Sequence, residues 1–518
     1  MAYDADTESY SAHASSQSMG ERVMGFWTPR RLAFPIFLIL ATYTLFMGWS
    51  AGLVDPDYYW HLKAGELIWK DQTLPEGDPF SWSFQGQPWV LHEWLFQVAL
   101  YLWESTFGKA GTAIATAVLT AVSVYIAYAV ADSFIQRPAV SFMLAIVFAG
   151  GIAAAGAPRP HMVSILFFAI TLALVFRAKY WHRHAGLLLI PVMMLIWVNA
   201  HGGYALGIAI MLAFTGFEFL NLLGRRRFRQ QVWLCLWLSV VTAATIAASL
   251  VNPDGIAHWS YPFYVAKLEL VSAIEEWKSI MTSPTRGLWY AGGAMVFFVL
   301  VFGSGRRLDV TELLFPIIVF IAGLMQARHA PFATLTFLAF AGPALARETE
   351  PHPAPRAAAP KALGWVLALA TLAVPAVFTR SAYFEAVRQI MPSDTVAFVE
   401  ETGLKGNMFN EYDIGGYLID RLYPERKVFI DGRADLYGDA FYKAFADTLY
   451  GNVPLATHFD GWDIEYVIAG PRTPLVHMLM MRGDFRLVHR GRRYLVLVRE
   501  EGVNAEALSG LPALPGVK

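Results

Sequence analysis

"DPDYYWHLKAGELIW", from Asp55 to Trp69, follows an apolar run that ends near Ala51. The run is about twenty residues long, which is enough for a helix to cross the hydrocarbon core of a bilayer. The stretch therefore places two carboxylates, separated by one proline, at the edge of a predicted membrane span. Ionisable groups at such a position are costly unless they have partners or water, and they are typical of functional sites.

The composition of the whole chain also indicates a membrane protein. Of its 518 residues, 56% are hydrophobic and only 16% are charged, and the mean hydropathy is +0.42, which is too apolar for an ordinary soluble enzyme. A net charge of −1 gives no indication of a nucleic-acid partner. The single cysteine, Cys235, excludes an intramolecular disulfide and a cysteine-rich metal site. Residues 1–30 do not have the short basic region of a cleaved signal peptide, so we expect the first span to remain as an anchor.

The apolar runs predict a polytopic α-helical membrane protein with about eleven transmembrane helices. The predicted spans are 32–52, 110–132, 138–156, 161–178, 186–200, 203–223, 231–251, 287–304, 309–326, 329–346 and 362–379. Lys and Arg accumulate on cytoplasmic connections, and here they fall on alternate ones. They are Arg22, Arg30 and Arg31; Arg137; Arg177, Lys179 and Arg183; Arg225, Arg226, Arg227 and Arg229; and Arg306 with Arg307.

This pattern predicts a cytoplasmic tail (1–31), a transmembrane domain (32–379) with a large first outer loop (53–109), and a C-terminal domain (380–518) outside the membrane. It requires that 89–106, "WVLHEWLFQVALYLWEST", lies along the membrane surface as an amphipathic helix. If 89–106 were a span, the basic loops would be outside.

The non-basic connections then share the outer face, and they carry the motifs "DPDYYWHL", "HEW", "APRPH", "NAHGGY", "NPDG", "EEWKS" and "ARHAP". Acids, histidines and arginines at the ends of several spans are expensive unless they line a wet cavity. The candidate site residues are Asp55, Asp57, His61, His92, Glu93, Arg159, His201, Arg328 and His329.

Structural roles remain open for several of these residues. Asp57 is a possible cap of a helix that begins at Tyr58. His201, with Asn199 beside it, is a possible partner of helix termini. Arg159 and Arg328 are possible snorkelling residues that reach the lipid headgroups.

Residues 380–518 alternate helical patterns such as "SDTVAFVEETG" with the strand-like runs "KVFID", "IEYVIAG" and "RYLVLVR", which predicts a small α/β domain. Gly415 and Gly416 permit a tight turn, but no nucleotide-binding motif accompanies them. Asp431 and Arg433 lie at the end of a predicted strand that is followed by a turn, where they are either displayed for function or paired in a structural turn.

The order of these features resembles the GT-C membrane glycosyltransferases: a long first span, an acidic motif in a large outer loop, a surface helix, many further spans and a soluble C-terminal domain. That superfamily includes protein O-mannosyltransferases, oligosaccharyltransferases and lipid A aminoarabinose transferases, and the likeness covers mainly 32–346. More narrowly, "DPDYYWHLKAG…DPFSWSFQGQPWVLHEWL", "NAHGG" and "GGYLI…VFIDGRADLYG" resemble a bacterial group of multi-pass proteins assigned to that superfamily.

The resemblance implies an inner-membrane enzyme that takes a sugar from a polyprenyl-phosphate carrier and transfers it to an envelope lipid, glycan or protein at the outer face. Asp57 resembles the catalytic acid of the first-loop motif most closely, with Asp55 second, although Pro56 separates the two acids where the superfamily has an adjacent pair. Either acid is suited to a general base or to a divalent metal. The leaving phosphate requires fixed cations or hydrogen-bond donors. The residues expected to bind it or the substrates are Arg328, Arg159, His61, His329, His92, Glu93 and His201.

Two other classes of protein share some of these features. A transporter would also place polar residues in the membrane, but internal repeats and charges near the middle of broken helices are expected there. A scaffold of an envelope assembly would account for the C-terminal domain but not for the acids of the first loop.

Overall fold

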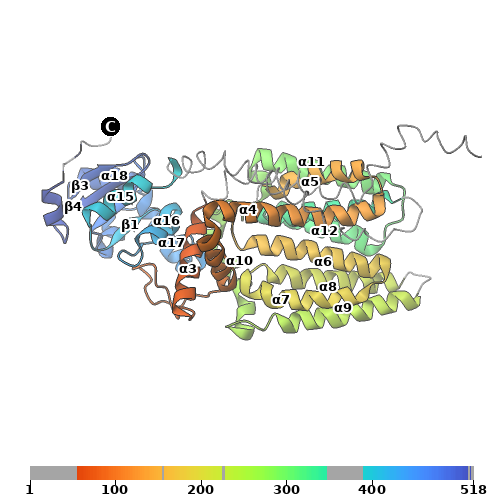
Figure 1. Ribbon diagram of the computed structural model, residues 1–518. Coiled ribbons are helices and arrows are strands. Elements are labelled where there is room, and N and C mark those ends of the chain that lie inside the picture. The colour runs from red at the N-terminus through yellow and green to blue at the C-terminus, as the bar shows by residue number, and fades with distance from the viewer. Residues whose placement is uncertain (1–54, 154–156, 224–227, 347–388, 512–513, 515–518) are drawn as a thin grey trace, which may run out of the picture.

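The computed structural model describes residues 55–153, 157–223, 228–346, 389–511 and 514. A bundle of long helices forms one part, and a small domain with a sheet forms the other (Figure 1). Helix α3 (Pro56–Asp71) lies between the two parts. The predicted tail 1–31 and the predicted spans 32–52 and 362–379 lie outside the described residues.

Each predicted span between 110 and 346 has a helix in the bundle. Five of the described helices are long and apolar enough to cross a membrane, and the others are shorter. The protein is therefore a multi-pass helical membrane protein, while the count of eleven spans stays a prediction. The helices are α4 (Trp94–Ile135), α5 (Pro138–Ala153), α6 (His161–Trp181), α7 (Leu189–Ala200), α8 (Tyr204–Leu222), α9 (Phe228–Ala248), α11 (Pro284–Gly303), α12 (Val310–Met325) and α13 (Ala330–Leu345).

Helix α4 is bent at Gly108, which has φ 66° and ψ −178°. Glycine adopts this conformation without the steric cost that a side chain would add. The bend separates a first arm, 94–107, from the predicted span 110–132. The first arm packs on α3 closely enough that a Cβ on Gly65 would lie 2.0 Å from the carbonyl oxygen of Gln97. The predicted amphipathic segment is thus a separate helical arm, and its position along a membrane surface stays a prediction.

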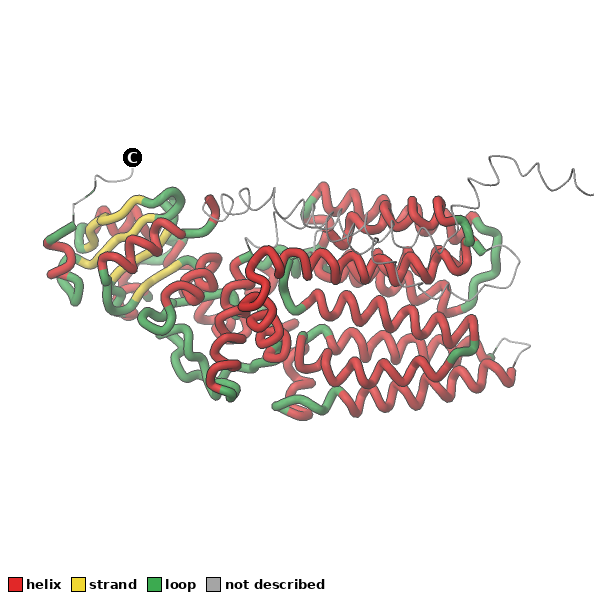
Figure 2. Tube along the Cα trace, viewed as in Figure 1, coloured by secondary structure: helices red, strands yellow, loops and turns green. Residues whose placement is uncertain are grey.

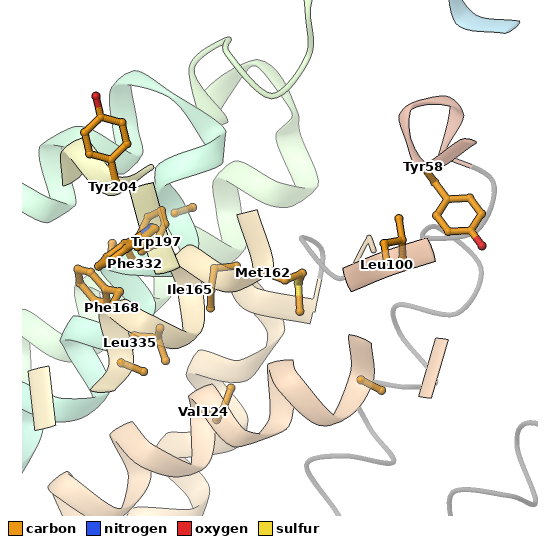
Figure 3. Close-up of a cluster of buried hydrophobic side chains, with 14 of the residues drawn as sticks. Tyr58, Leu100, Val124, Met162, Ile165, Phe168, Trp197, Tyr204, Phe332 and Leu335 are labelled. Atoms are coloured by element: carbon orange, nitrogen blue, oxygen red, sulfur yellow. The ribbon is translucent and has the colours of Figure 1, made fainter. Parts of the chain in front are cut away.

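Helix α13 is the centre of the bundle, because every residue from Ala330 to Ala344 is buried. It contacts α4, α5, α6, α11 and α12. Figure 3 shows Phe332 of α13 beside Phe168 of α6, with 5.1 Å between the ring centroids. Inside a membrane such close packing, rather than burial from water, holds helices together.

Helices α4 and α6 finish at the same end of the bundle, which we call the basic end. This end contains a buried polar cluster. Lys179 of α6 binds Glu218 of α8, and its Nζ lies 2.8 Å from Oδ2 of Asp309, the N-cap of α12. Gln231 of α9 donates to the Glu218 carboxylate at 2.7 Å. Buried charges in a membrane need such partners, and this cluster ties four helices together.

The C-terminal domain is built on a four-stranded sheet in the order β1-β2-β4-β3, drawn in yellow in Figure 2. β1 pairs with β2 in parallel, and the other neighbours are antiparallel. The predicted helix and the strands predicted in "IEYVIAG" and "RYLVLVR" are confirmed as α15, β2 and β4. The elements are α15 (Ser393–Thr402), β1 (Met408–Asn410), α16 (Gly415–Leu422), α17 (Ala434–Leu449), β2 (Tyr466–Ala469), α18 (Pro474–Arg482), β3 (Phe485–Arg490), β4 (Leu495–Arg499) and α19 (Ala505–Ser509).

The prediction that "KVFID" forms a strand of this sheet was wrong. Val428 instead makes one isolated bridge to Ser81 of the first loop. The Val428 amide donates to the Phe80 carbonyl at 3.1 Å, and the Trp82 amide donates to the Val428 carbonyl at 3.0 Å. The first loop thereby joins the C-terminal domain through its backbone.

Candidate active site

Helix α3 presents the two aspartates of the opening motif at its N-terminus. Asp55 is the N-cap, and its Oδ1 accepts a hydrogen bond from the Asp57 amide at 3.0 Å. Pro56 occupies the first helical position, where the missing N–H costs nothing. The alternative in which Asp57 caps a helix from Tyr58 is therefore not found, because Asp55 is the N-cap and the helix begins at Pro56. The Asp57 side chain is left for other contacts.

Arg159, in the connection before α6, forms ion pairs with three carboxylates. Its Nε and Nη2 each lie 2.6 Å from an oxygen of Asp55. Its Nη1 lies 3.1 Å from Asp57 Oδ2 and 3.3 Å from Glu276 Oε2. Such a fork binds carboxylates strongly, so Arg159 is an ion-pair partner of the aspartates and not a snorkelling residue.

The Asp57 carboxylate is set up to titrate near neutral pH. Burial raises its pKa to about 7, and the nearby carboxylates of Asp55 and Glu276 add to the rise. Arg159 opposes the rise, as does the hydrogen bond that Trp60 Nε1 donates to Asp57 Oδ1 at 3.1 Å. A carboxylate with such a pKa can accept a proton at neutral pH and release it again.

Glu93, the N-cap of α4, lies among three histidines. The distances from its carboxylate oxygens are 3.3 Å to His92 Nε2, 3.7 Å to His61 Nε2 and 3.9 Å to His201 Nε2. Burial alone would raise the pKa of Glu93, but the imidazoles, His92 above all, hold it below its ordinary value. Burial lowers the pKa of His61 and of His201 to about 3, so both are neutral hydrogen-bonding groups at neutral pH.

The possible metal role of Asp55 and Asp57 stays a prediction. Among the residues that the structure describes, no group of three or more His, Cys, Asp and Glu side chains is arranged to hold a metal ion. Both aspartates instead face the Arg159 guanidinium. Arg159 thus supplies the positive charge that a metal ion would otherwise supply there.

Arg328 lies in the short turn Ala327–His329 before α13. Its guanidinium stacks over the Trp277 ring at 4.1 Å, and its backbone amide donates to the Glu276 carbonyl at 3.0 Å. The guanidinium has no hydrogen bond or ion pair with any residue in the described ranges. Next to it, burial and the charge of Arg328 lower the pKa of His329 to about 4. The Arg328 charge is thus available to an anion.

The nine predicted site residues therefore lie at one end of the bundle, which we call the motif end. They form two groups. Asp55, Asp57 and Arg159 form one group, to which Arg328 is joined through Glu276. The other group is centred on Glu93. The candidate site residues predicted from the sequence did not include Glu276, Trp60 and Asp435. Glu276 is in the quoted motif "EEWKS", and its interaction with Arg159 had no signal in the sequence.

The C-terminal domain also reaches this end of the bundle. Tyr261 is the first residue of the short helix α10 (Tyr261–Lys267), and its ring centroid lies 4.2 Å from that of His92. Tyr261 also interacts with Asp435 at the start of α17. Burial raises the pKa of Asp435, while His92 opposes the rise. Asp435 thus joins the group around Glu93 from the C-terminal domain.

Asp431 and Arg433 form a buried ion network. Arg433 Nη1 lies 2.6 Å from Asp78 Oδ1 of the first loop, and its Nη2 lies 2.7 Å from Asp431 Oδ2. Tyr437 donates a further hydrogen bond to Asp431 at 2.6 Å. The alternative of a salt-bridged structural turn is confirmed, and the network also fixes the first loop on the C-terminal domain.

Comparisons with known proteins bear on the fold. No family model and no curated protein matches the sequence. Among solved structures, the oligosaccharyltransferase of Archaeoglobus fulgidus in its apo form is similar with a TM-score of 0.55 and 13% identity, over 86% of this chain and 70% of that one. ArnT from Cupriavidus metallidurans bound to undecaprenyl phosphate is similar with a TM-score of 0.52 and 14% identity, over 90% and 97%.

The apo state of the same ArnT gives a TM-score of 0.51 with 14% identity, over 89% of this chain and 97% of that one. Oligosaccharyltransferase and ArnT are both GT-C glycosyltransferases. At such low identity the likeness concerns the fold, and it extends over most of the chain. The protein therefore has the fold of the GT-C membrane glycosyltransferases, as the order of its sequence features predicted.

Proposed function

We propose that the protein is a membrane glycosyltransferase that moves a sugar from a polyprenyl-phosphate-linked donor to an envelope acceptor, which is a lipid, glycan or protein. The GT-C fold supports this class of reaction, and a structural neighbour binds undecaprenyl phosphate. The observation that carries the proposal is Asp57, a carboxylate with a pKa of about 7 beside the Arg159 guanidinium at the end of a helical bundle.

The reaction is placed at the outer face of the bacterial inner membrane. The connections at the basic end carry Arg137, Arg183, Arg306 and Arg307, whereas the candidate acids and histidines lie at the motif end together with Arg159, Arg286 and Arg328. Because basic residues accumulate on the cytoplasmic side, the motif end and the C-terminal domain are assigned to the outside. The donor would reach this end from within the bilayer.

In the proposed reaction the Asp57 carboxylate takes the proton of an acceptor hydroxyl while the hydroxyl oxygen attacks the anomeric carbon. The new bond to that carbon forms as its bond to the phosphate oxygen breaks, and the lipid phosphate leaves with the electron pair. Arg328 is the cation assigned to this phosphate, because its guanidinium makes no hydrogen bond or ion pair with a carboxylate among the described residues, although its charge helps to lower the pKa of Glu276. Arg159 is assigned to holding Asp55 and Asp57, since its nitrogens already contact carboxylates.

The histidines then act through hydrogen bonds and not through charge. The low pKa values of His61, His201 and His329 keep these imidazoles neutral at neutral pH. His92 is the exception: burial lowers its pKa, but the adjacent Glu93 outweighs burial and raises it. The group around Glu93 thus lines one side of the proposed site with hydrogen-bonded side chains.

The direct test is sugar release by the purified protein in detergent from a polyprenyl-phosphate-linked sugar. We expect release to increase with pH, with an apparent pKa of about 7, because burial raises the pKa of Asp57 and only the ionised carboxylate accepts a proton. Below that pH the rate should fall by about tenfold per pH unit. A transporter or a scaffold would release no sugar at any pH.

Arg328→Gln is expected to lower kcat/KM for the donor by about a hundredfold, because a fixed cation stabilises the charge that develops on the leaving phosphate. The measurement is initial rates over a range of donor concentrations. Arg286→Gln is the matched control, since Arg286 is another arginine of the motif end and, within the part of the chain that the structure describes, its guanidinium pairs only with the exposed Glu275 at 4.0 Å. Equal kinetics in the two variants would remove Arg328 from the phosphate site.

A further inference from the structure

Two glycines of the C-terminal domain meet the first turn of α3. A Cβ on Gly416 would lie 2.2 Å from the Pro56 carbonyl oxygen, and a Cβ on Gly432 would lie 1.8 Å from Asp57 Oδ1. Both distances are far below van der Waals contact. The Asp57 carboxylate thus rests directly on the main chain of Gly432, where any other residue would displace one of the two.

The turn around Gly432 is held on both sides and has little freedom to move. Its neighbours Asp431 and Arg433 are 0% and 1% exposed, and they belong to the ion network with Asp78. The Gly432 carbonyl accepts a hydrogen bond from the Tyr412 hydroxyl at 3.1 Å. Moving the turn would break these buried contacts, which is costly.

Asp57 is the more movable partner in this contact. Its side chain is 21% exposed, and among the described residues its carboxylate is held by the hydrogen bond from Trp60 and by the ion pair with Arg159. An added methyl group at Gly432 would therefore be accommodated by displacement of the carboxylate. The same methyl would also lie 3.3 Å from Trp60 Nε1, the donor to Asp57.

We propose that Gly432 is a positioning residue for the transfer reaction, because its missing side chain lets the Asp57 carboxylate lie between the bundle and the C-terminal domain. The C-terminal domain is then part of the active site and not an appendage of it. This inference rests on the proposed function, in which Asp57 is the general base. Tyr412 acts with Gly432 by holding the turn in place.

The test is Gly432→Ala in the full-length protein, with Gly461→Ala as the matched control. Gly461 is in the same domain, and a Cβ there has no atom within 4 Å. Displacing a reacting group by about 1 Å costs about a hundredfold in rate. We expect that loss in kcat for Gly432→Ala, with donor KM within about twofold of wild type, because the phosphate contacts remain. The acid limb should move to lower pH as the carboxylate enters water.

Adding Gly432→Ala to the Asp57→Asn variant distinguishes a positioning role of Gly432 from a purely structural one. In Asp57→Asn the base is already absent, so adding Gly432→Ala should cause no further loss of transfer, whereas a folding defect would add its own loss. If Gly432→Ala fails to fold, Tyr412→Phe replaces it, and a loss of about tenfold in kcat is expected. Normal kcat in whichever of the two variants folds would overturn the proposal.

Amide hydrogen exchange of residues 57–60 in α3 distinguishes a failure of this inference from a failure of the proposed function. Exchange should be faster in Gly432→Ala than in wild type and Gly461→Ala, whether or not sugar is transferred, because the contact itself is disturbed. Absence of sugar release by the wild type would refute the proposed function alone. Unchanged exchange in Gly432→Ala would overturn the positioning role.

Discussion

Asp57→Asn is expected to lower sugar transfer by about a hundredfold or more while the yield of folded protein stays unchanged. Asparagine has nearly the same shape and can still accept the hydrogen bond from Trp60 Nε1, which is 3.1 Å away in the wild type. It cannot accept the acceptor proton as a carboxylate does. The measurement is initial transfer rates and folded yield of purified variants, and the pH limb with the apparent pKa of about 7 should disappear with the carboxylate.

Asp55→Asn is the matched comparison, because it changes the other acid of the same motif. Asparagine caps helices about as well as aspartate, so α3 should keep its start, but the paired contacts of Asp55 with Arg159 lose their charge. We expect a loss of about tenfold, through the altered position of Arg159. Full transfer in both variants would end the carboxylate-base hypothesis. Rescue of a partly active variant by raised divalent-ion concentration would instead indicate a metal role for the pair.

Arg433→Met is expected to destabilise the C-terminal domain by about 3–5 kcal/mol, because it leaves the buried carboxylates of Asp78 and Asp431 without their cation. Methionine fills much of the volume, so the loss reports charge more than packing. The free energy of unfolding is measured by pulse proteolysis of the full-length protein in urea. Arg482→Met is the control, since its pairs with Asp460 and Asp484 are partly exposed and worth about 0–1 kcal/mol. Equal destabilisation of both variants would contradict a special cost at the buried network.

Much of the architecture was predictable because it depends on local patterns. Apolar runs located the helices of the bundle between 110 and 346, and the alternation of basic and motif-bearing connections correctly placed Asp57, Arg159 and Arg328 at one end. The GT-C likeness came from the order of the features, not from any one motif. Such patterns can be read from the sequence because apolar helices and polar connections alternate along the chain.

Contacts between distant segments were not predictable in this way. "KVFID" has the composition of a strand, but the partner of Val428 is Ser81 in the first loop, and no local pattern connects the two. Likewise, the choice of cap depends on the backbone. Asp55 adopts extended φ and ψ, and its side chain accepts a hydrogen bond from the Asp57 amide, so the helix begins at Pro56 and not at Tyr58. Glu276 and Asp435 acquired their roles only through tertiary contacts.

The joining of the first loop to the C-terminal domain also determines when the site is completed during biosynthesis. Asp78 and Arg433 are separated by 355 positions in the chain. At about 5–20 residues per second, roughly 20–70 s pass between the synthesis of the two residues. During that time every helix from α4 to α13 is made, while Asp78 waits without its arginine. The site beside Asp57 is therefore completed only after Gly432 and Arg433 have been made, so a chain that stops before Gly432 lacks the turn that the Asp57 carboxylate contacts.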